Sequence, residues 1–351
     1  MTKVAASVCL IGLMISTTAN AHHPGGVGNT TGVGPIFTIS AATLEQGHAA
    51  LGLWYEYARL SGLSDAQLIT AAGQHIHAHS IKTIESAVAA FAYGITNDLM
   101  VSVRAPINRR TDIREGHHSH GPEGNTVDFR GDSTGFGDMT ALGQWRFYNN
   151  IITQTQAALL FGVKAPTGTT NLDDINGELF ETEFQPGTGS WDWLLGAAFT
   201  QQFGAWSFDT NVLYVGVSIG AQQTSMGDRF SYNAAVSYRL MGAANDPRNA
   251  FAHAGHSHNP SVLKAPVTVP RPSFALDAIF EINGEWHDKQ TVAGVVDQNS
   301  GGNVIYLGPG LRATYDRFSA YTLIGLPIVN HMNGLQSKSD YKVLTGMSFA
   351  F

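Results

Sequence analysis

Apolar and polar residues alternate with a period of two through most of the chain beyond its N-terminal region. Side chains two residues apart point to the same face of an extended strand. In the stretch WSFDTNVLYVG (206–216), Phe208 and Val212 therefore share one face, whereas Asp209 and Asn211 share the opposite face. Segments of about ten residues with this pattern are typical of transmembrane β-barrels, whose apolar face contacts lipid and whose polar face lines the lumen.

About twelve such segments are present, an even number that suits a closed bacterial barrel with both termini on the periplasmic side. The connections alternate between tight turns and longer loops, as periplasmic turns and outer loops do. We therefore predict an all-β fold, a transmembrane antiparallel β-barrel of about twelve strands, over residues 47–351. The predicted strands start near residues 47, 81, 99, 137, 153, 191, 206, 229, 273, 303, 317 and 340.

The predicted loops differ in how well they fit this alternation. Long outer loops are expected at 59–80, 110–134 and 167–190, among others. The connection 242–272 should be a periplasmic turn, yet it is long and rich in proline. It is either an inserted periplasmic loop or it contains a strand that the pattern does not reveal.

A soluble β-sandwich is the alternative fold, because its strands also alternate apolar and polar residues. The solvent-facing positions of a sandwich usually carry more Lys and Glu than the polar positions of this chain. Only 13% of the residues are charged, 10% are aromatic and 39 are glycine, which is an unusual composition for a soluble domain. The composition therefore favours the membrane barrel.

Both ends of the chain carry export signals. Lys3 precedes a short apolar run that ends in the small residues Ala19-Asn20-Ala21, so residues 1–21 are predicted to be a removable signal peptide. The last residue, Phe351, is aromatic and in phase with the apolar face, which is the type of signal that the outer-membrane assembly machinery reads. We expect the outer membrane of a Gram-negative bacterium as the location, with its lipid and this machinery as partners.

The inward phase of the predicted strands assigns charged residues of both signs to the lumen. Rings of one sign select ions of the other sign, so a mixed lining favours ion pairs that brace the wall over an ion-selective pore. The Gly-rich residues 22–46 form a periplasmic segment or a plug that partly fills this lumen. The predicted lumen-lining residues are Glu56, Arg104, Arg146, Lys164, Asp209, Arg239, Asp277, Glu281, Arg312 and Lys342.

Histidines gather in three clusters outside the predicted strands. Neutral imidazole binds Zn²⁺ and Cu²⁺, and Cys9, the single cysteine, is removed with the signal peptide. No cofactor is required by the fold, but we hypothesise that the two outer clusters meet at one rim and bind Zn²⁺ or Cu²⁺. There are two alternatives. The histidines are polar loop residues without a specific role, or their protonation makes the charge of the loops depend on pH. The outer candidates are His75, His77, His79, His117, His118 and His120, and the third cluster is His253, His256 and His258.

The sequence gives little reason to expect an enzyme or a nucleic-acid-binding protein. GDSTG (131–135) matches G-x-S-x-G, but a nucleophile elbow requires a strand, a sharp turn and a helix, whereas Ser133 is followed by a predicted strand. Without the signal peptide, 19 basic and 27 acidic residues leave a net charge of −8, which does not favour a nucleic-acid partner.

Three segments resemble a known family. GFGDMTALGQWRFY (135–148), LFGVKAPTG (160–168) and PGTGSWDWLLGAAFTQQFG (186–204) are similar to characteristic segments of the outer-membrane proteins grouped as the MetA-pathway of phenol degradation family. The resemblance extends over about 34–351 and implies a barrel that accompanies the catabolism of aromatic compounds and acts as a channel.

The leading functional hypothesis is a passive outer-membrane channel or uptake protein for small aromatic or hydrophobic compounds. One alternative is a metal-handling barrel with His-rich loops. The other is a barrel with a structural role in the envelope and no substrate.

Overall fold

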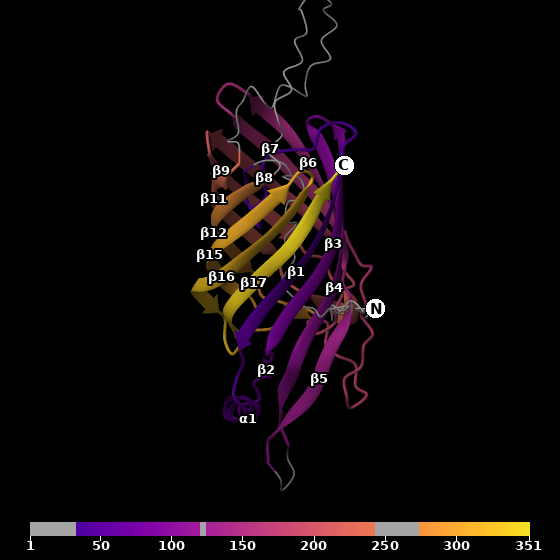
Figure 1. Cartoon of the computed structure of the whole chain (residues 1–351). Coiled ribbons are helices and arrows are strands. Elements are labelled where there is room, and N and C mark those ends of the chain that lie inside the picture. Colours follow the sequence, from indigo (N-terminus) through magenta and orange to yellow (C-terminus); the bar gives the residue numbers. More distant parts are fainter. Residues whose placement is uncertain (1–32, 120–123, 243–273) are drawn as a thin grey trace, which may run out of the picture.

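The computed structural model describes residues 33–119, 124–242 and 274–351. The predicted signal peptide, His120, the third histidine cluster and nearly all of the connection 242–272 lie outside the described residues. The described strands wrap around one axis into a closed antiparallel barrel of twelve strands, as Figure 1 shows. The predicted fold class and strand number are therefore confirmed.

One of the twelve wall strands is interrupted. β5 pairs with the outer part of β4 and β6 pairs with its periplasmic part, so β5 and β6 together occupy one position in the wall. The wall strands are β1 (Ala49–Ser61), β3 (Thr83–Thr96), β4 (Leu99–His117), β5 (Thr126–Phe136) with β6 (Met139–Asn150), β7 (Thr155–Ala165), β8 (Asp192–Phe203), β9 (Trp206–Gly216), β11 (Arg229–Met241), β12 (Ala275–His287), β15 (Gly302–Tyr315), β16 (Phe318–Met332) and β17 (Lys338–Ala350). The loops contain α1 (Asp65–Gly73), β2 (His79–Ser80), η1 (Ala221–Gln223), β10 (Thr224–Ser225), β13 (Thr291–Val292) and β14 (Val295–Val296).

The first and last strands close the ring. β1 pairs with β17 from Ala50 opposite Ala350 onward, and the backbone N–H of Phe351 donates a hydrogen bond of 2.9 Å to the carbonyl of Ala49. β11 pairs directly with β12 along nearly its whole length. No position remains for a further wall strand between these two neighbours, whatever the connection 242–272 contains.

Two of the predicted outer connections contain regular structure that the sequence pattern did not reveal. β4 continues to His117 and β5 starts at Thr126, so most of 110–134 is a hairpin that extends beyond the barrel rim (Figure 1). A hairpin outside the bilayer needs no lipid face, which explains why its sequence lacks the apolar alternation. α1 lies in the loop between β1 and β3, where Ser64 and Gln67 form a capping box at its N-terminus.

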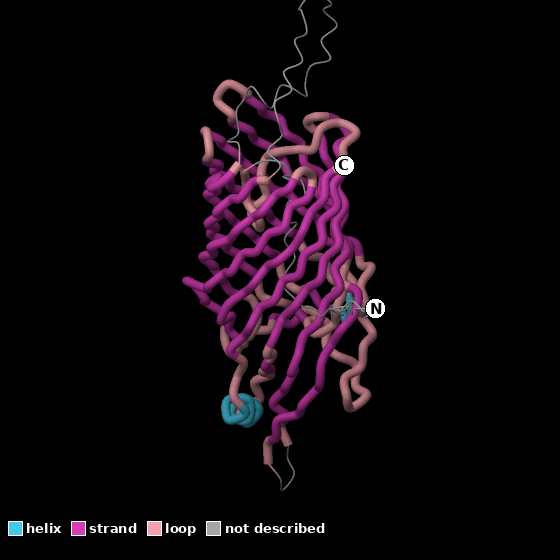
Figure 2. Tube along the Cα trace, viewed as in Figure 1, coloured by secondary structure: helices cyan, strands magenta, loops and turns pink. Residues whose placement is uncertain are grey.

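The two ends of the barrel differ. α1 and the β4–β5 hairpin lie at one end, whereas the C-terminus and the short β8–β9 and β15–β16 turns lie at the other (Figures 1 and 2). Long loops mark the outer face of bacterial barrels and short turns mark the periplasmic face. Among the described residues, no helix has the length and apolar character needed to cross a membrane.

Large apolar side chains cover the outside of the wall. In β9, Phe208 and Val212 are exposed, whereas Asp209 and Asn211 on the alternate positions are buried. Aromatic residues gather at the periplasmic strand ends, where the ring of Trp206 packs 4.5 Å from that of Tyr238. An apolar belt with interfacial aromatic residues is the surface that a bilayer requires.

The lipid face can be tested at Val212, which is 41% exposed near the middle of β9. We expect Val212→Arg to lower the free energy of unfolding in lipid by about 2–4 kcal/mol, because the charge enters hydrocarbon. Val295→Arg is the matched control, since Val295 is 72% exposed in an outer loop, and its effect should stay within about 0.5 kcal/mol. Equal losses in urea titrations of the two variants would contradict the assignment.

Candidate functional site

The chain immediately before β1 lies inside the barrel. Ile36 and Ile39 are buried, and their neighbours on the wall are inward-facing side chains rather than lipid-facing ones. The backbone N–H of Ile39 donates to Asn211 Oδ1 at 2.9 Å, and that of Ala41 donates to Thr200 Oγ1 at 2.8 Å. Residues 33–44 therefore occupy the interior and are bonded to several wall strands.

Glu281 holds this segment in place. Its fully buried carboxylate accepts hydrogen bonds from the backbone N–H groups of Ile36, Phe37 and Thr38, at 2.6, 2.9 and 2.9 Å. The Thr38 hydroxyl donates a fourth bond at 2.8 Å. Hydrogen bonds to an ionised group are stronger than neutral ones, and they become stronger in a dry interior. Glu281 is therefore the principal anchor of the N-terminal segment.

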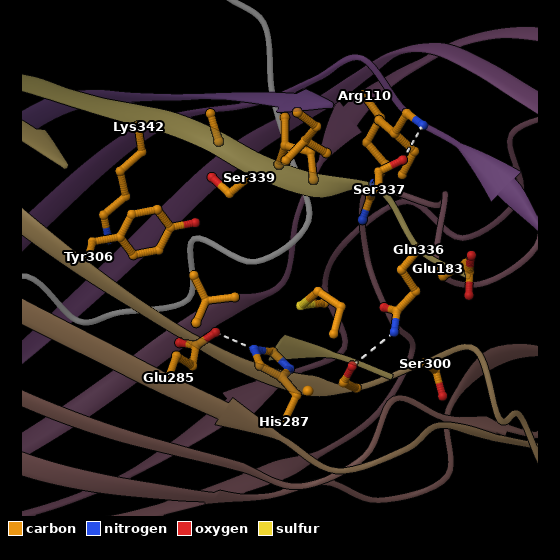
Figure 3. Close-up of a pocket in the computed structure, with 18 of the residues that line it drawn as sticks. Arg110, Glu183, Glu285, His287, Ser300, Tyr306, Gln336, Ser337, Ser339 and Lys342 are labelled. Atoms are coloured by element: carbon orange, nitrogen blue, oxygen red, sulfur yellow. Dashed lines mark hydrogen bonds and ion pairs between the residues drawn. The ribbon is translucent and has the colours of Figure 1, made fainter. Parts of the chain in front are cut away.

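A cavity of about 250 Å³ lies in the outer half of the barrel. Phe37 of the N-terminal segment is part of its lining, together with the outer ends of β1, β12, β15 and β17 (Figure 3). Leu60, Ile84 and Val304 contribute apolar wall, and Tyr306 contributes an aromatic ring. The polar lining includes Glu56, Glu285, His287, Ser339 and Lys342.

The Lys342 ammonium lies between two aromatic rings. Its Nζ is 4.1 Å from the centroid of Phe37 and 4.1 Å from that of Tyr306. Both contacts are within the range of cation–π attraction. The arrangement places a positive charge at the cavity surface and ties the lining of the cavity to the N-terminal segment.

The ten predicted lumen residues occupy three kinds of position. Glu56 and Lys342 line the cavity. Arg146 lies at the periplasmic end, where its Nη2 is 2.9 Å from Asp98 Oδ1. The other seven are buried side chains of the inner wall, namely Arg104, Lys164, Asp209, Arg239, Asp277, Glu281 and Arg312.

Several of these buried charges pair with one another or with loops. Arg239 is ion-paired to Asp277, and the Arg312 guanidinium donates to the carbonyl of Pro35. The Lys164 ammonium lies 2.6 Å from Asp192 and 3.3 Å from Asp138. The interior is thus braced by ion pairs and by the N-terminal segment.

A second group of charged residues forms the outer rim. His77 Nε2 lies 2.6 Å from Glu115 Oε1 and 3.4 Å from Glu181 Oε1. His79 is ion-paired to Glu183, and both side chains are mostly buried. Burial lowers the pKa of His79, but Glu183 and the neighbouring carboxylates outweigh burial and raise it to about 9. We call His77, His79, Glu115, Glu181 and Glu183 the rim cluster.

The remaining predicted histidines lie beside this cluster. The rings of His75 and His118 are 4.2 Å apart, so the first two outer loops do meet. His117 is 62% exposed, and its Nδ1 is 3.8 Å from Asp128. Sequence reasoning missed Glu115, Glu181 and Glu183, because no periodic pattern or spacing links them to the histidines.

Ser133 of the GDSTG stretch lies within β5 rather than in the predicted loop 110–134, and the strand predicted to follow it is β6. Its side chain is buried, and its hydroxyl donates a hydrogen bond to the backbone carbonyl of Phe184. The hydroxyl is thus engaged with a loop rather than with a histidine.

The fold and the lipid-facing belt define an integral outer-membrane β-barrel. A family model described as "Putative MetA-pathway of phenol degradation" matches residues 83–259, just over half of the 351 residues. The chain therefore belongs to this family. The resemblance in the three quoted segments is confirmed, and so is the outer membrane of a Gram-negative bacterium as the location.

Solved structures are similar to this chain at low sequence identity. The COG4313 outer membrane channel from Pseudomonas putida F1 is 15% identical and has a TM-score of 0.52, over 89% of this chain and 98% of the other. LpxR from Salmonella typhimurium is 11% identical, with a TM-score of 0.41 over 85% and 99% of the two chains. The CymD monoaromatic hydrocarbon channel is 11% identical, with a TM-score of 0.38 over 92% and 98%. No curated protein matches this chain.

Proposed function

We propose that the protein is a passive outer-membrane channel that takes up small aromatic or hydrophobic compounds. The cavity in the outer half of the barrel carries this proposal, because it combines apolar wall and aromatic rings with polar and charged side chains. An apolar cavity of about 150 Å³ holds one benzene molecule. A cavity of about 250 Å³ therefore suits a single substituted ring.

The polar lining indicates which rings would be retained. Lys342 and Tyr306 present an ammonium and a phenol next to each other, and Glu285 is paired with His287, two residues away on β12 (Figure 3). These groups can hydrogen-bond a hydroxyl or carbonyl substituent while the apolar wall contacts the ring. Binding sites for small molecules commonly combine apolar lining with a few such polar groups. The substrate class is thus monocyclic aromatic compounds with one polar substituent, such as phenols.

The family and the solved fold relative support transport. The family is named for phenol degradation, and the relative from Pseudomonas putida is described as a channel. Transport rather than catalysis also fits Ser133, whose hydroxyl is bonded to a backbone carbonyl. Residues 33–44 lie between the cavity and the periplasm, so a solute can pass only when this segment moves out of its path. Passage should therefore be slow.

The cavity can be filled by substitution. Ala58 lines it from β1, so we expect Ala58→Trp to reduce phenol uptake into proteoliposomes at least tenfold, because the indole occupies the space that a ring needs. Ala89→Trp is the matched control, since Ala89 is exposed on the outer face of β3 and should leave uptake unchanged. Equal uptake by Ala58→Trp and the parent protein would exclude the cavity from the route.

A further inference from the structure

The rim cluster brings together three segments that are distant in sequence. His77 and His79 come from the loop after α1, Glu115 comes from the outer part of β4, and Glu181 and Glu183 come from the loop between β7 and β8. His79 and Glu183 also line the cavity, so the cluster lies at its outer mouth. The transport proposal assigns no role to these five side chains.

The spacing of three of these groups suits a metal ion. His77, His79 and Glu181 each offer one ligand atom, and these atoms all lie within 4.8 Å of one another. A tetrahedral ion with bonds of about 2.0–2.2 Å places its ligand atoms about 3.3–3.6 Å apart. His77 Nε2 and Glu181 Oε1 are already 3.4 Å apart. The ligand atom of His79 lies within 4.8 Å of both.

The charge of the cluster also favours a cation. Three carboxylates face two imidazoles, and Arg130, 3.8 Å from Glu115, is itself bound to Asp174 and Glu178 at 2.7 Å. Even when both imidazoles are protonated, the three carboxylates leave the cluster with an excess of one negative charge. A divalent ion would neutralise this negative charge. It would also attract the oxygens of Glu115 and Glu181, which otherwise compete for the imidazole of His77.

His79 is arranged as a metal-binding histidine. One ring nitrogen, Nε2, contacts Glu183, and the other, Nδ1, is buried and has no hydrogen-bond partner among the described residues. Metal-bound histidines commonly donate their second ring N–H to a carboxylate, which fixes the tautomer and the ring orientation. Glu183 is placed for that role, which leaves Nδ1 available as the ligand atom.

We propose that His77, His79 and Glu181 bind a divalent transition-metal ion at the outer mouth of the cavity. Two imidazoles and one carboxylate form a known zinc donor set that leaves a fourth position open, whereas Mg²⁺ and Ca²⁺ prefer oxygen ligands alone. An ion bound to His77 Nε2 would replace the present 2.6 Å contact of this nitrogen with Glu115 Oε1. The site differs from the sequence-based hypothesis, because its oxygen ligand comes from a loop without histidines.

Calorimetric titration of the purified full barrel with Zn²⁺ tests the site. We expect one tight site in the parent protein and at least a tenfold loss of affinity in both His77→Ala and Glu181→Gln. His117→Ala is the matched control, because His117 is a rim histidine that is 62% exposed and lies beside Asp128 instead. It should keep the parent affinity.

Glu181→Gln is the more informative variant, because Glu181 is 44% exposed and its amide replacement should not disturb folding. The site is overturned if the parent protein binds no Zn²⁺, or if His77→Ala and Glu181→Gln bind as His117→Ala does. It is also overturned if all three variants lose affinity equally, because the rim histidines would then bind as an unspecific group. Circular dichroism confirms that each variant is folded before titration.

Discussion

Glu281→Ala is expected to increase the single-channel conductance of the purified protein in planar bilayers several-fold. The carboxylate accepts four hydrogen bonds from Ile36, Phe37 and Thr38, and its removal leaves three backbone N–H groups buried without an acceptor. Each such group costs about 1–3 kcal/mol, so the segment should leave the interior for water. The parent protein should show small, intermittent conductance with weak ion selectivity, because the charges of its interior are mixed and paired.

Glu85→Gln is the matched control for this variant. Glu85 is also a buried wall carboxylate, but it accepts from the hydroxyls of Tyr55 and Thr83. Its conductance should match that of the parent protein. Deleting residues 22–46 should raise conductance to the level of Glu281→Ala, and combining the two changes should add nothing. A large steady conductance in the parent protein, unchanged by the deletion, would show that the segment does not obstruct the lumen.

Lys164→Met is expected to lower the free energy of unfolding by about 3–5 kcal/mol, because it leaves two buried carboxylates without their common cation. Asp192 and Asp138 lie 2.6 and 3.3 Å from the ammonium, and all three side chains are almost fully buried. Asp138 also accepts from the backbone N–H groups of Gly168 and Thr188, so the outer loop between β7 and β8 depends on the same cluster.

The control for Lys164→Met is the same kind of substitution in a solvent-exposed ion pair. Arg109 and Asp132 are 2.7 Å apart, but both side chains are more than one-third exposed. Arg109→Met should therefore cost about 0–1 kcal/mol. Urea titrations in the same lipid compare the two variants, and a loss of less than about 1 kcal/mol for Lys164→Met would show that water reaches the two carboxylates.

The sequence was most informative where one face of a strand contacts lipid. In β9, Val212 and Asp209 lie on opposite faces in the sequence pattern and in the structure alike, because a bilayer imposes a strict period of two. Outside the bilayer this constraint ends. The β4–β5 hairpin beyond Arg110 and helix α1 bury only a few apolar side chains in small local clusters, so neither could be recognised from apolar periodicity.

The functional groups were predictable only in part. The inward phase of Glu281 and Lys342 could be derived from the alternation, but their contacts with Phe37 depend on strand register and on the path of the N-terminal segment. Glu181 could not be linked to His77 at all, because the two residues belong to loops without periodicity. Only the closed ring of strands brings those loops to the same rim.

The path of the N-terminal segment also determines the order in which the molecule can fold. Several of its hydrogen-bond partners lie far along the chain: Thr200 is 159 residues from Ala41, and Arg312 is 277 residues from Pro35. Closing loops of this length costs entropy that only a preformed wall can repay. We therefore expect the segment to settle after the strands have assembled, so that a newly inserted barrel is open at first.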